Sequence, residues 1–343
     1  MDVSFGASTC FLFSDTMKKI VFAILAVVLK ALLPSCAVLK PISYERLQGT
    51  DVNFPEQVRA VGVVNCLPDL PTRVWVDDVQ NSYEGEGQLT AESLAQGMAE
   101  TRYFDQVVIC DSAYVPSDVN AGLSYGQMDS LIRNLDVDML FTVERVLLEM
   151  STDKVWFPEL MQRIPVLRVG VTPLVGAYKK DRERPLFKVC KTDTIYWELP
   201  LESDLNEVVR SASEYAGTIP LKYMLPYWEE VHRCYFDGGS AEMRDAGIYV
   251  REQDWDAAAE LWRTVCGKKK GRYKLHAAYN LTLYHEMRDE IEQAKECLEM
   301  AYGLSKEGSF EYSLIKAYAL QLEEQMLKNQ RLQIQMKRFE VFF

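Results

Sequence analysis

The chain has few residues of the types that usually carry catalysis. Its three histidines are His232, His276 and His285. His285-Glu286 begins like the His-Glu-x-x-His motif of zinc metalloproteases, in which two histidines bind the metal from one face of a helix. Asp289 stands where the second histidine belongs, so this ligand pair is incomplete. No Gly-x-Gly-x-x-Gly or Walker sequence is present. We therefore expect structural histidines, no metal, no cofactor and no enzymatic activity.

Four acidic residues lie close together in the first half of the chain. They are Asp77, Asp78, Glu84 and Glu86. Carboxylate oxygens are the ligands that hard cations such as Ca²⁺ prefer, so a cation site is one interpretation. Clustered acids in a polar stretch are also typical of a solvated loop. We expect the solvated loop.

Six cysteines are widely spaced along the chain beyond residue 36. No two of them form a Cys-x-x-Cys pair, which leaves zinc and thioredoxin-like interpretations without support. Small buried thiols and disulfides both stay open for these residues. They are Cys66, Cys110, Cys190, Cys234, Cys266 and Cys297.

The N-terminal stretch has the pattern of a secretion signal. Met17 is followed by Lys18 and Lys19 and then by a largely apolar run over residues 20–33. A helix that spans a membrane needs about 20 apolar residues, and this run is shorter and contains Lys30. The sequence predicts a signal peptide over residues 1–35, with Met17 as the true start.

Leu33-Pro34-Ser35-Cys36 at the end of that stretch resembles the bacterial lipoprotein box. The resemblance implies cleavage before Cys36, lipid attachment to its thiol, and a tether over residues 36–57. In some Bacteroidetes lipoproteins an acidic cluster after the cysteine directs the protein to the outer face, and residues 37–40 have none. The resemblance thus implies an outer-membrane lipoprotein that faces the periplasm. A soluble secreted protein is the alternative.

Residues 58–200 have the order of a small α/β domain. An apolar run over residues 58–64 predicts a buried strand, Thr90 offers an N-cap for a helix ending near Tyr103, and a second strand follows at residues 107–110. Strand, helix and strand in this order indicate a parallel unit. A further helix and three further extended segments follow, of which the last two suit an antiparallel hairpin; they are residues 128–135, 137–148, 166–178 and 186–199. We expect a mixed sheet in two or three layers.

Two loops of this domain are longer than usual. Residues 67–89 and 111–126 follow the first two predicted strands, whereas such connections usually have two to six residues. Both would leave the carboxyl edge of the sheet, where open α/β folds place ligands. They suit either a binding rim or a lid without a ligand, and we expect the second.

The remainder of the chain has helical periodicity. Residues 201–237 are predicted to be bridging helices, from the spacing of Leu205, Val208 and Val209 and then of Leu221, Met224, Leu225 and Trp228. Two similar hairpins follow within residues 238–343, at an offset of 36 that pairs Ala258 with Ala294 and Trp262 with Leu298. This pattern resembles the tetratricopeptide repeat. A capping helix is expected after it.

The tetratricopeptide resemblance places three residues on a concave, peptide-binding side. They are Arg244, Tyr279 and Asn280. Ordinary packing for Tyr279 and a hydrogen bond between helices for Asn280 are the alternative roles.

Signal, α/β domain and repeats together resemble a family of Bacteroidetes lipoproteins with a domain of unknown function of the 6340 type. The first domain is similar to those of the curli-secretion lipoprotein CsgG and the N-terminal domain of TolB. The chain is 48 % hydrophobic with a net charge of −12, which suits a globular protein and disfavours nucleic acid as a partner. We expect a non-catalytic adaptor that is bound to the membrane by its lipid and contacts envelope proteins, with self-association open. The alternative is a periplasmic ligand receptor or enzyme that uses the long loops.

Overall fold

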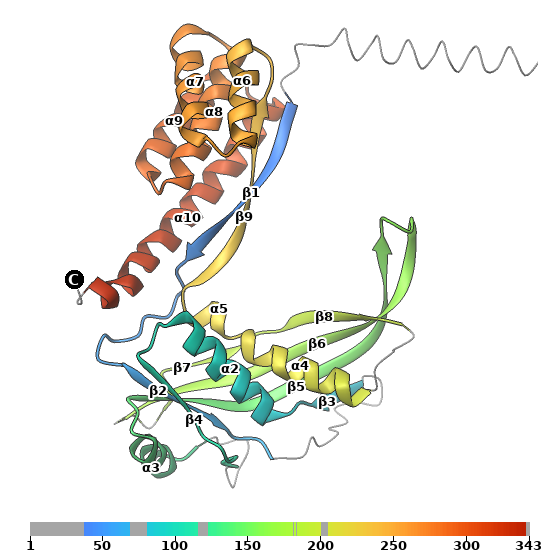
Figure 1. The fold of residues 1–343 in the computed structure, drawn as a ribbon, viewed down its shortest axis with the longest axis vertical. Helices are drawn as coiled ribbons and strands as arrows, with labels where there is room; N and C mark the ends of the chain where they lie inside the picture. The colour runs from blue at the N-terminus through green and yellow to red at the C-terminus, as the bar shows by residue number, and fades with distance from the viewer. Residues whose placement is uncertain are drawn as a thin grey trace, which may run out of the picture. The chain divides into compact units, whose positions relative to one another are not determined.

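The computed structural model describes residues 38–68, 81–115, 123–180, 182, 184–199 and 205–340. The chain forms two compact units. Of the described residues, the sheet unit contains those within 47–229 and 328–340, and the helical unit contains 38–46 and 230–327. The chain therefore passes from one unit to the other at three places. Figure 1 labels the elements of both units.

A seven-stranded mixed sheet forms the centre of the sheet unit. Its order is β4-β2-β5-β6-β7, with β3 paired to β5 and β8 paired to β6. β2 is parallel to both β4 and β5, while β6 is antiparallel to β5. The strands are β2 (Ala60–Asn65), β3 (Asn81–Glu84), β4 (Gln106–Ile109), β5 (Met139–Phe157), β6 (Gln162–Lys179), β7 (Phe187–Cys190) and β8 (Asp193–Glu198). The predicted mixed α/β sheet and its antiparallel hairpin are confirmed.

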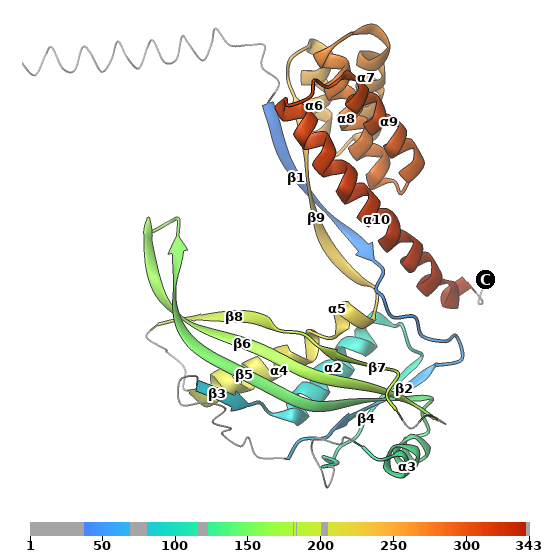
Figure 2. The same ribbon diagram turned by 180° about the vertical axis from the view of Figure 1, so that it is seen from behind.

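Helices cover both faces of this sheet. α2 (Gly87–Thr101) and α4 (Leu205–Thr218) pack on one face with a large apolar core, and α3 (Tyr125–Leu135) packs on the other (Figures 1 and 2). α2 and α4 approach closely because Gly217 has no side chain: a Cβ there would lie 2.5 Å from the Thr90 carbonyl oxygen. Four aromatic rings surround Phe54 at one end of the core, and they are those of Tyr103, Phe104, Phe141 and Phe187.

The start of α2 differs from the prediction. The helix begins at Gly87, and Thr90 lies one turn inside it rather than at the N-cap. Thr90 is buried, and its hydroxyl donates to the carbonyl oxygen of Ser213 in α4 at 2.7 Å. Threonine is a residue type that often begins a helix, but Thr90 instead joins two helices through its hydroxyl.

Helical hairpins dominate the helical unit. α6 (Ala241–Arg251) pairs with α7 (Trp255–Lys268), and α8 (Arg272–Met287) pairs with α9 (Ile291–Leu304); α10 (Phe310–Glu340) follows. Ala258 and Ala294 are fully buried in α7 and α9, as are the large residues Trp262 and Leu298 one turn later. The two predicted hairpins and the all-helical C-terminal stretch are confirmed.

Two segments have a different structure from the one predicted. Residues 38–48, predicted as part of a tether, form β1 (Val38–Gln48), and residues 227–237, predicted as helix, form β9 (Tyr227–Asp237). β1 and β9 pair in a two-stranded sheet. Only one helical turn, α5 (Leu221–Met224), precedes β9. Pro226 disfavours helix for the residue before it, and the aromatic and β-branched residues that follow favour a strand.

Candidate protein-interaction site

The four residues proposed from the sequence as sites differ in whether the structure describes them and in how exposed they are. Cys36 lies outside the described residues. Arg244 is exposed on α6, whereas Tyr279 and Asn280 on α8 are buried. Tyr279 has the packing role that was its alternative above, whereas Asn280 bonds to a strand rather than to another helix.

Asn280 fixes strand β9 to helix α8. Its Oδ1 accepts a hydrogen bond from the Phe236 N–H, and its Nδ2 donates to the Phe236 carbonyl oxygen, both at 2.8 Å. Tyr279 packs against Phe236 and Tyr318 with ring centroids 5.2 Å apart in each case. Both side chains are therefore used inside the unit.

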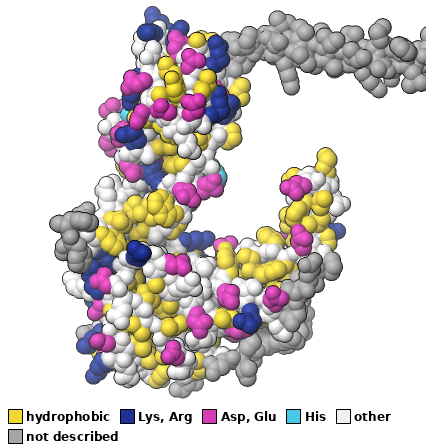
Figure 3. Space-filling view, viewed as in Figure 1, with side chains coloured by type: hydrophobic (Ala, Val, Ile, Leu, Met, Phe, Trp, Pro, Cys, Tyr) yellow, Lys and Arg dark blue, Asp and Glu magenta, His cyan; other side chains and the backbone are white. Residues whose placement is uncertain are grey.

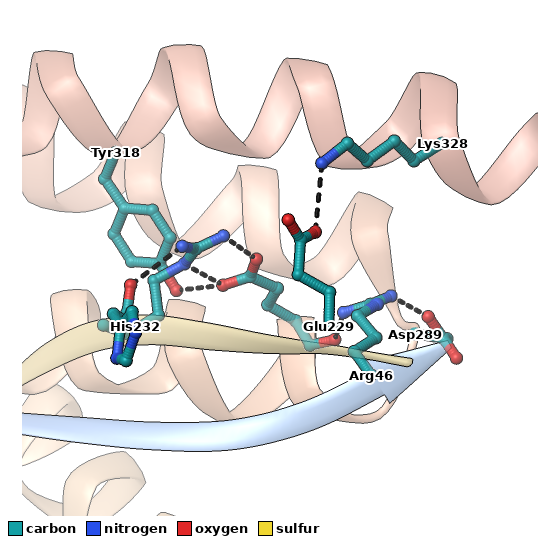
Figure 4. Close-up of polar contacts among 8 residues, drawn as sticks. Arg46, Glu229, His232, Asp289, Tyr318 and Lys328 are labelled. Carbon is teal, nitrogen blue, oxygen red and sulfur yellow. Dashed lines mark hydrogen bonds and ion pairs between the residues drawn. The ribbon is translucent and has the colours of Figure 1, made fainter. Parts of the chain in front are cut away.

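A buried ionic network lies beside this contact (Figure 4). Glu286 on α8 is fully buried, and its carboxylate accepts two hydrogen bonds from Arg233 of β9, at 2.6 and 3.0 Å, and one from the Tyr318 hydroxyl at 2.6 Å. Arg46 of β1 donates to the Glu286 carbonyl oxygen at 2.8 Å and also pairs with Asp289. The Glu286 carboxylate thus joins α8, β9 and α10, and its backbone carbonyl adds β1.

This network stabilises the fold and is not arranged for proton transfer. Burial lowers the pKa of Arg233, but the hydrogen bonds and charge of Glu286 outweigh burial and raise that pKa above its ordinary value. Burial, helped by Glu286, also raises the pKa of Tyr318 well above its usual range. Both groups are held in their ordinary protonation states, whereas catalytic acids and bases have pKa values near the working pH.

The histidines are dispersed among different contacts. His276 stacks on Phe236 at 3.8 Å, and burial lowers its pKa to about 4, so it is neutral at pH 7. The ring of His285 lies 2.6 Å from Glu290, and His232 is exposed. Among the described residues no three His, Cys, Asp or Glu side chains are placed to hold a metal ion.

The carboxyl edge of the sheet is filled by polar groups that pair with one another. Glu144 accepts hydrogen bonds from Tyr178 at 2.8 Å, from Lys188 at 2.5 Å and from Thr142 at 3.2 Å. Burial raises the pKa of the neighbouring Cys66 thiol to about 12, so it stays protonated and unreactive. Part of each long loop, residues 69–80 and 116–122, lies outside the described residues.

The acidic stretch in the first of these loops is only partly described. Asp77 and Asp78 are outside the described residues. Glu84 belongs to strand β3, where it is half-buried and accepts a hydrogen bond from the Val146 N–H at 3.2 Å. Burial raises the pKa of Glu84. For Glu84, the expectation of a solvated loop is therefore wrong, because the residue pairs with β5.

An apolar groove runs between α9 and α10 of the helical unit. Its volume is about 450 Å³. Leu298, Ile315 and Leu322 form its buried floor, while Tyr302 and Leu320 stand at its edges, Leu320 with 70 % of its surface exposed. Each helix also contributes one lysine and one glutamate to the rim: Lys295 and Glu299 from α9, and Lys316 and Glu323 from α10.

The repeated hairpins explain why this groove is open. α7 and α9 are the second helices of their hairpins, and they begin 36 residues apart at Trp255 and Ile291. α10 begins at Phe310, where the first helix of a third hairpin belongs, and continues as one helix of 31 residues. A second helix for this hairpin is absent from the described chain up to residue 340. The faces of α9 and α10 that such a helix would cover therefore stay exposed.

Sequence reasoning did not find this groove. Phe310 and the residues after it were expected to cap the array, so an apolar outer face on α10 was not considered. A signal was available, because the exposed residues Phe310, Leu320, Leu327 and Ile334 are all large and apolar on a helix whose other exposed positions are mostly charged or polar.

The protein therefore combines a mixed α/β unit with a helical unit. In the helical unit, no described helix takes the place of the second helix of a third hairpin. No described helix has the length and hydropathy needed to cross a membrane. The chain belongs to the family of the Domain of unknown function (DUF8603), whose model matches residues 58–236. The model of a second Domain of unknown function (DUF6340) matches residues 244–324. No curated protein matches the chain significantly.

Proposed function

We propose that this protein is a non-catalytic adaptor of the bacterial envelope that binds an amphipathic helix of a partner protein in the groove between α9 and α10. The observation that carries the proposal is that the described chain has no second helix for a third hairpin, which leaves Tyr302 and Leu320 exposed beside the buried apolar floor. Peptide helices commonly bind in such grooves through apolar residues at positions i, i+3 or i+4 and i+7.

The rim of the groove suits a helix with charges of both signs beside its apolar face. Lys295 and Lys316 can pair with acidic side chains, while Glu299 and Glu323 can pair with basic ones. Rim charges of this kind set orientation and association rate more than affinity. The apolar floor would supply most of the binding free energy.

The envelope location rests on the sequence. The signal over residues 1–35 and the lipoprotein-like Cys36 support a lipid-anchored, periplasm-facing protein on the outer membrane. Mass spectrometry of the protein from the membrane fraction tests this part by itself. A mature chain that begins at Cys36 with acyl chains is expected, and an unmodified chain with another N-terminus would remove the location but not the groove.

A photo-crosslinking amino acid at Leu320 tests the partner. In intact cells we expect a covalent adduct whose peptide mapping identifies an amphipathic helix of another protein. The matched control is the same amino acid at Ile248, which is exposed on α6 away from the groove residues. Adducts of equal yield at both positions, or an adduct at 320 with a second copy of this chain, would contradict the proposal.

A purified peptide of the mapped helix then gives the affinity. Leu320→Asp places a charge at the edge of the apolar groove and should weaken binding at least tenfold, about 1.4 kcal/mol. The alternative function is a ligand receptor or enzyme at the carboxyl edge of the sheet. It predicts instead that Glu144→Gln abolishes the protein's function in cells, while Leu320→Asp leaves that function unchanged.

A further inference from the structure

The β5–β6 hairpin continues beyond the rest of the sheet. β3 pairs with β5 only up to Met150, and β8 pairs with β6 only from Val166 onward. Residues 151–165, here called the arm, are therefore a two-stranded ribbon in which β5 and β6 pair only with each other among the described strands. Figures 1 and 2 show the arm extending away from the helices that cover the sheet.

The end of the arm has apolar side chains on both of its faces, with Gln162 on one face and Arg163 on the other. Val155 lies opposite Ile164 on one face, where Phe157 follows, and Trp156 lies opposite Arg163 on the other face. Leu160 and Met161 occupy the turn between the strands and are among the most exposed apolar residues described, Met161 with 79 % of its surface exposed. Figure 3 shows these hydrophobic side chains at the end of the arm.

Nearer the sheet, the arm becomes polar. Ser151, Thr152, Asp153 and Lys154 are all exposed. On β5 the apolar stretch covers residues 155–157, which is roughly 10 Å at 3.3 Å per residue, whereas on β6 the polar residues Gln162 and Arg163 precede Ile164. We call residues 155–164 the tip.

The turn at the tip keeps an apolar residue in an unfavourable conformation. The Met161 N–H donates to the Pro158 carbonyl oxygen at 3.2 Å, and Met161 has a φ of 49°. Glycine or asparagine suits this left-handed region better than a long side chain. Replacing Met161 by glycine should therefore favour folding, and a strained position with an exposed apolar side chain is a candidate for a functional role.

We infer that the tip inserts into the surface of a lipid bilayer. A protein partner that docks on one side of a β ribbon needs only one apolar face, whereas the tip has apolar side chains on both faces and in the turn, as suits a medium that surrounds it. Trp156 has the amphipathic ring that is enriched at membrane interfaces, and Lys154 and Arg163 can direct their charges outward to the headgroups.

The apolar length of the tip and its charged residues limit how deeply the tip can insert. An apolar length of roughly 10 Å matches the 5–10 Å to which interfacial elements enter the boundary between headgroups and acyl chains. Glu159 at the turn is acidic and exposed, and a carboxylate there opposes deeper entry. Glu159→Gln should therefore strengthen the interaction. This interaction is separate from the proposed helix groove, because the arm belongs to the sheet unit and the groove to the helical unit.

Tryptophan quenching in vesicles tests the inference. The full chain is mixed with vesicles of phosphatidylethanolamine and phosphatidylglycerol whose acyl chains carry bromine near the headgroup, and fluorescence is compared with that in unbrominated vesicles. We expect quenching that Trp156→Phe largely removes. Trp228→Phe is the matched control, since Trp228 is the more exposed tryptophan but lies outside the arm, and it should leave the quenched fraction intact.

A second set of variants separates insertion from folding. Leu160→Asp should reduce quenching of Trp156 at least threefold with unchanged thermal unfolding, because Leu160 is exposed in the folded chain. Met161→Gly should reduce quenching while raising the unfolding temperature. Quenching that persists in Trp156→Phe overturns the inference. A second result would also overturn it. If the parent shows no quenching and light scattering finds a dimer that Leu160→Asp abolishes, the tip contacts a second copy of the chain instead.

Discussion

One contact from each unit shows two chemically different ways of joining elements. In the sheet unit, α2 and α4 are connected by neutral groups: Thr90 donates to the Ser213 carbonyl oxygen, and the Ser213 hydroxyl accepts from the Glu86 N–H at 2.9 Å. In the helical unit, β9, α8 and α10 are connected through the ionised side chains of Glu286 and Arg233.

This difference determines how each unit responds to the loss of one partner. A neutral group that loses its partner costs the desolvation of one N–H or hydroxyl, about 1–3 kcal/mol. A buried ion that loses its partner costs about 3–5 kcal/mol. The helical unit should therefore be the more sensitive of the two to single polar substitutions and to pH.

The largest effect is expected at Glu286. Glu286→Leu leaves the Arg233 guanidinium buried without its carboxylate and should lower the free energy of unfolding of the helical unit by about 3–5 kcal/mol. Hydrogen exchange of α8 and α9 peptides, read by mass spectrometry, measures this loss separately from the sheet unit. Glu292→Gln, which breaks an ion pair of the 80 % exposed Glu292 with Lys295, is the control and should change stability by less than about 0.5 kcal/mol.

The double variant Glu286→Leu with Arg233→Met sharpens the test. If the cost comes from an unpaired ion, replacing both ions by apolar side chains should restore most of the lost stability. If the double variant is as unstable as Glu286→Leu, then the geometry of the network, rather than its charge, causes the larger loss of stability in the helical unit.

Acid should destabilise the helical unit through His276. Burial lowers the pKa of this histidine from 6.5 to about 4, although Glu311 lies 3.5 Å from its Nε2. Because the unfolded chain binds this proton and the folded chain does not, stability is fully present above about pH 6.5 and falls as the pH drops to about 4, by about 3 kcal/mol in all. Urea unfolding of the helical unit at pH 7 and pH 4.5 measures this loss, and His276→Gln should remove most of it. An equal pH dependence in parent and variant would assign the effect to other groups.

A smaller effect is expected in the sheet unit. Ser213→Ala removes the acceptor of the Glu86 N–H and should lower the stability of the sheet unit by about 1–2 kcal/mol, measured by hydrogen exchange of α2 peptides. Ser211→Ala in the same helix is the control, because Ser211 is exposed. A loss as large as that of Glu286→Leu would remove the contrast between the units.

The smallest effect on stability is expected in the groove. Leu320→Asp changes a side chain that is already exposed, so the unfolding free energy should change by less than about 0.5 kcal/mol while helix binding falls at least tenfold. Ile315→Asp is the contrasting variant, since Ile315 is buried and should unfold the unit. Loss of stability in Leu320→Asp would place Leu320 in the core rather than in a binding surface.

Local patterns predicted the elements whose stabilising contacts are near in sequence. The apolar run of β2 and the small and large residues of α7 and α9 predicted a buried strand and paired helices, and both are confirmed. β1 and β9 were missed because each strand is completed by a partner about 190 residues away, and strand preference depends strongly on that context. The available signal for β9 was its content of aromatic and β-branched residues, which are Tyr227, Trp228, Val231, Tyr235 and Phe236.

The candidate site was less predictable than the fold. Tyr279 and Asn280 were proposed as partner contacts because of their place in the repeat, but a repeat pattern does not show which faces a strand such as β9 will cover. The groove arises from a helix that the described chain does not contain, and the arm from strands that extend past their neighbours. The groove depends on where the pairing of helices ends, and the arm depends on where the pairing of strands ends. The types of the residues give little indication of either.

The three passages of the chain between the units constrain the order in which the protein can be completed during synthesis. Arg46 emerges from the ribosome long before Glu286, so the helical unit must wait for some 240 intervening residues before its first strand finds this contact. Conversely, Thr50 and Val52 of the sheet unit bond to Gln335, almost the last described residue, at 2.7 and 2.6 Å. The sheet unit therefore cannot finish folding before residue 335 has been synthesised. A chain of this kind is thus expected to need protection from proteases and from premature association until that residue has left the ribosome.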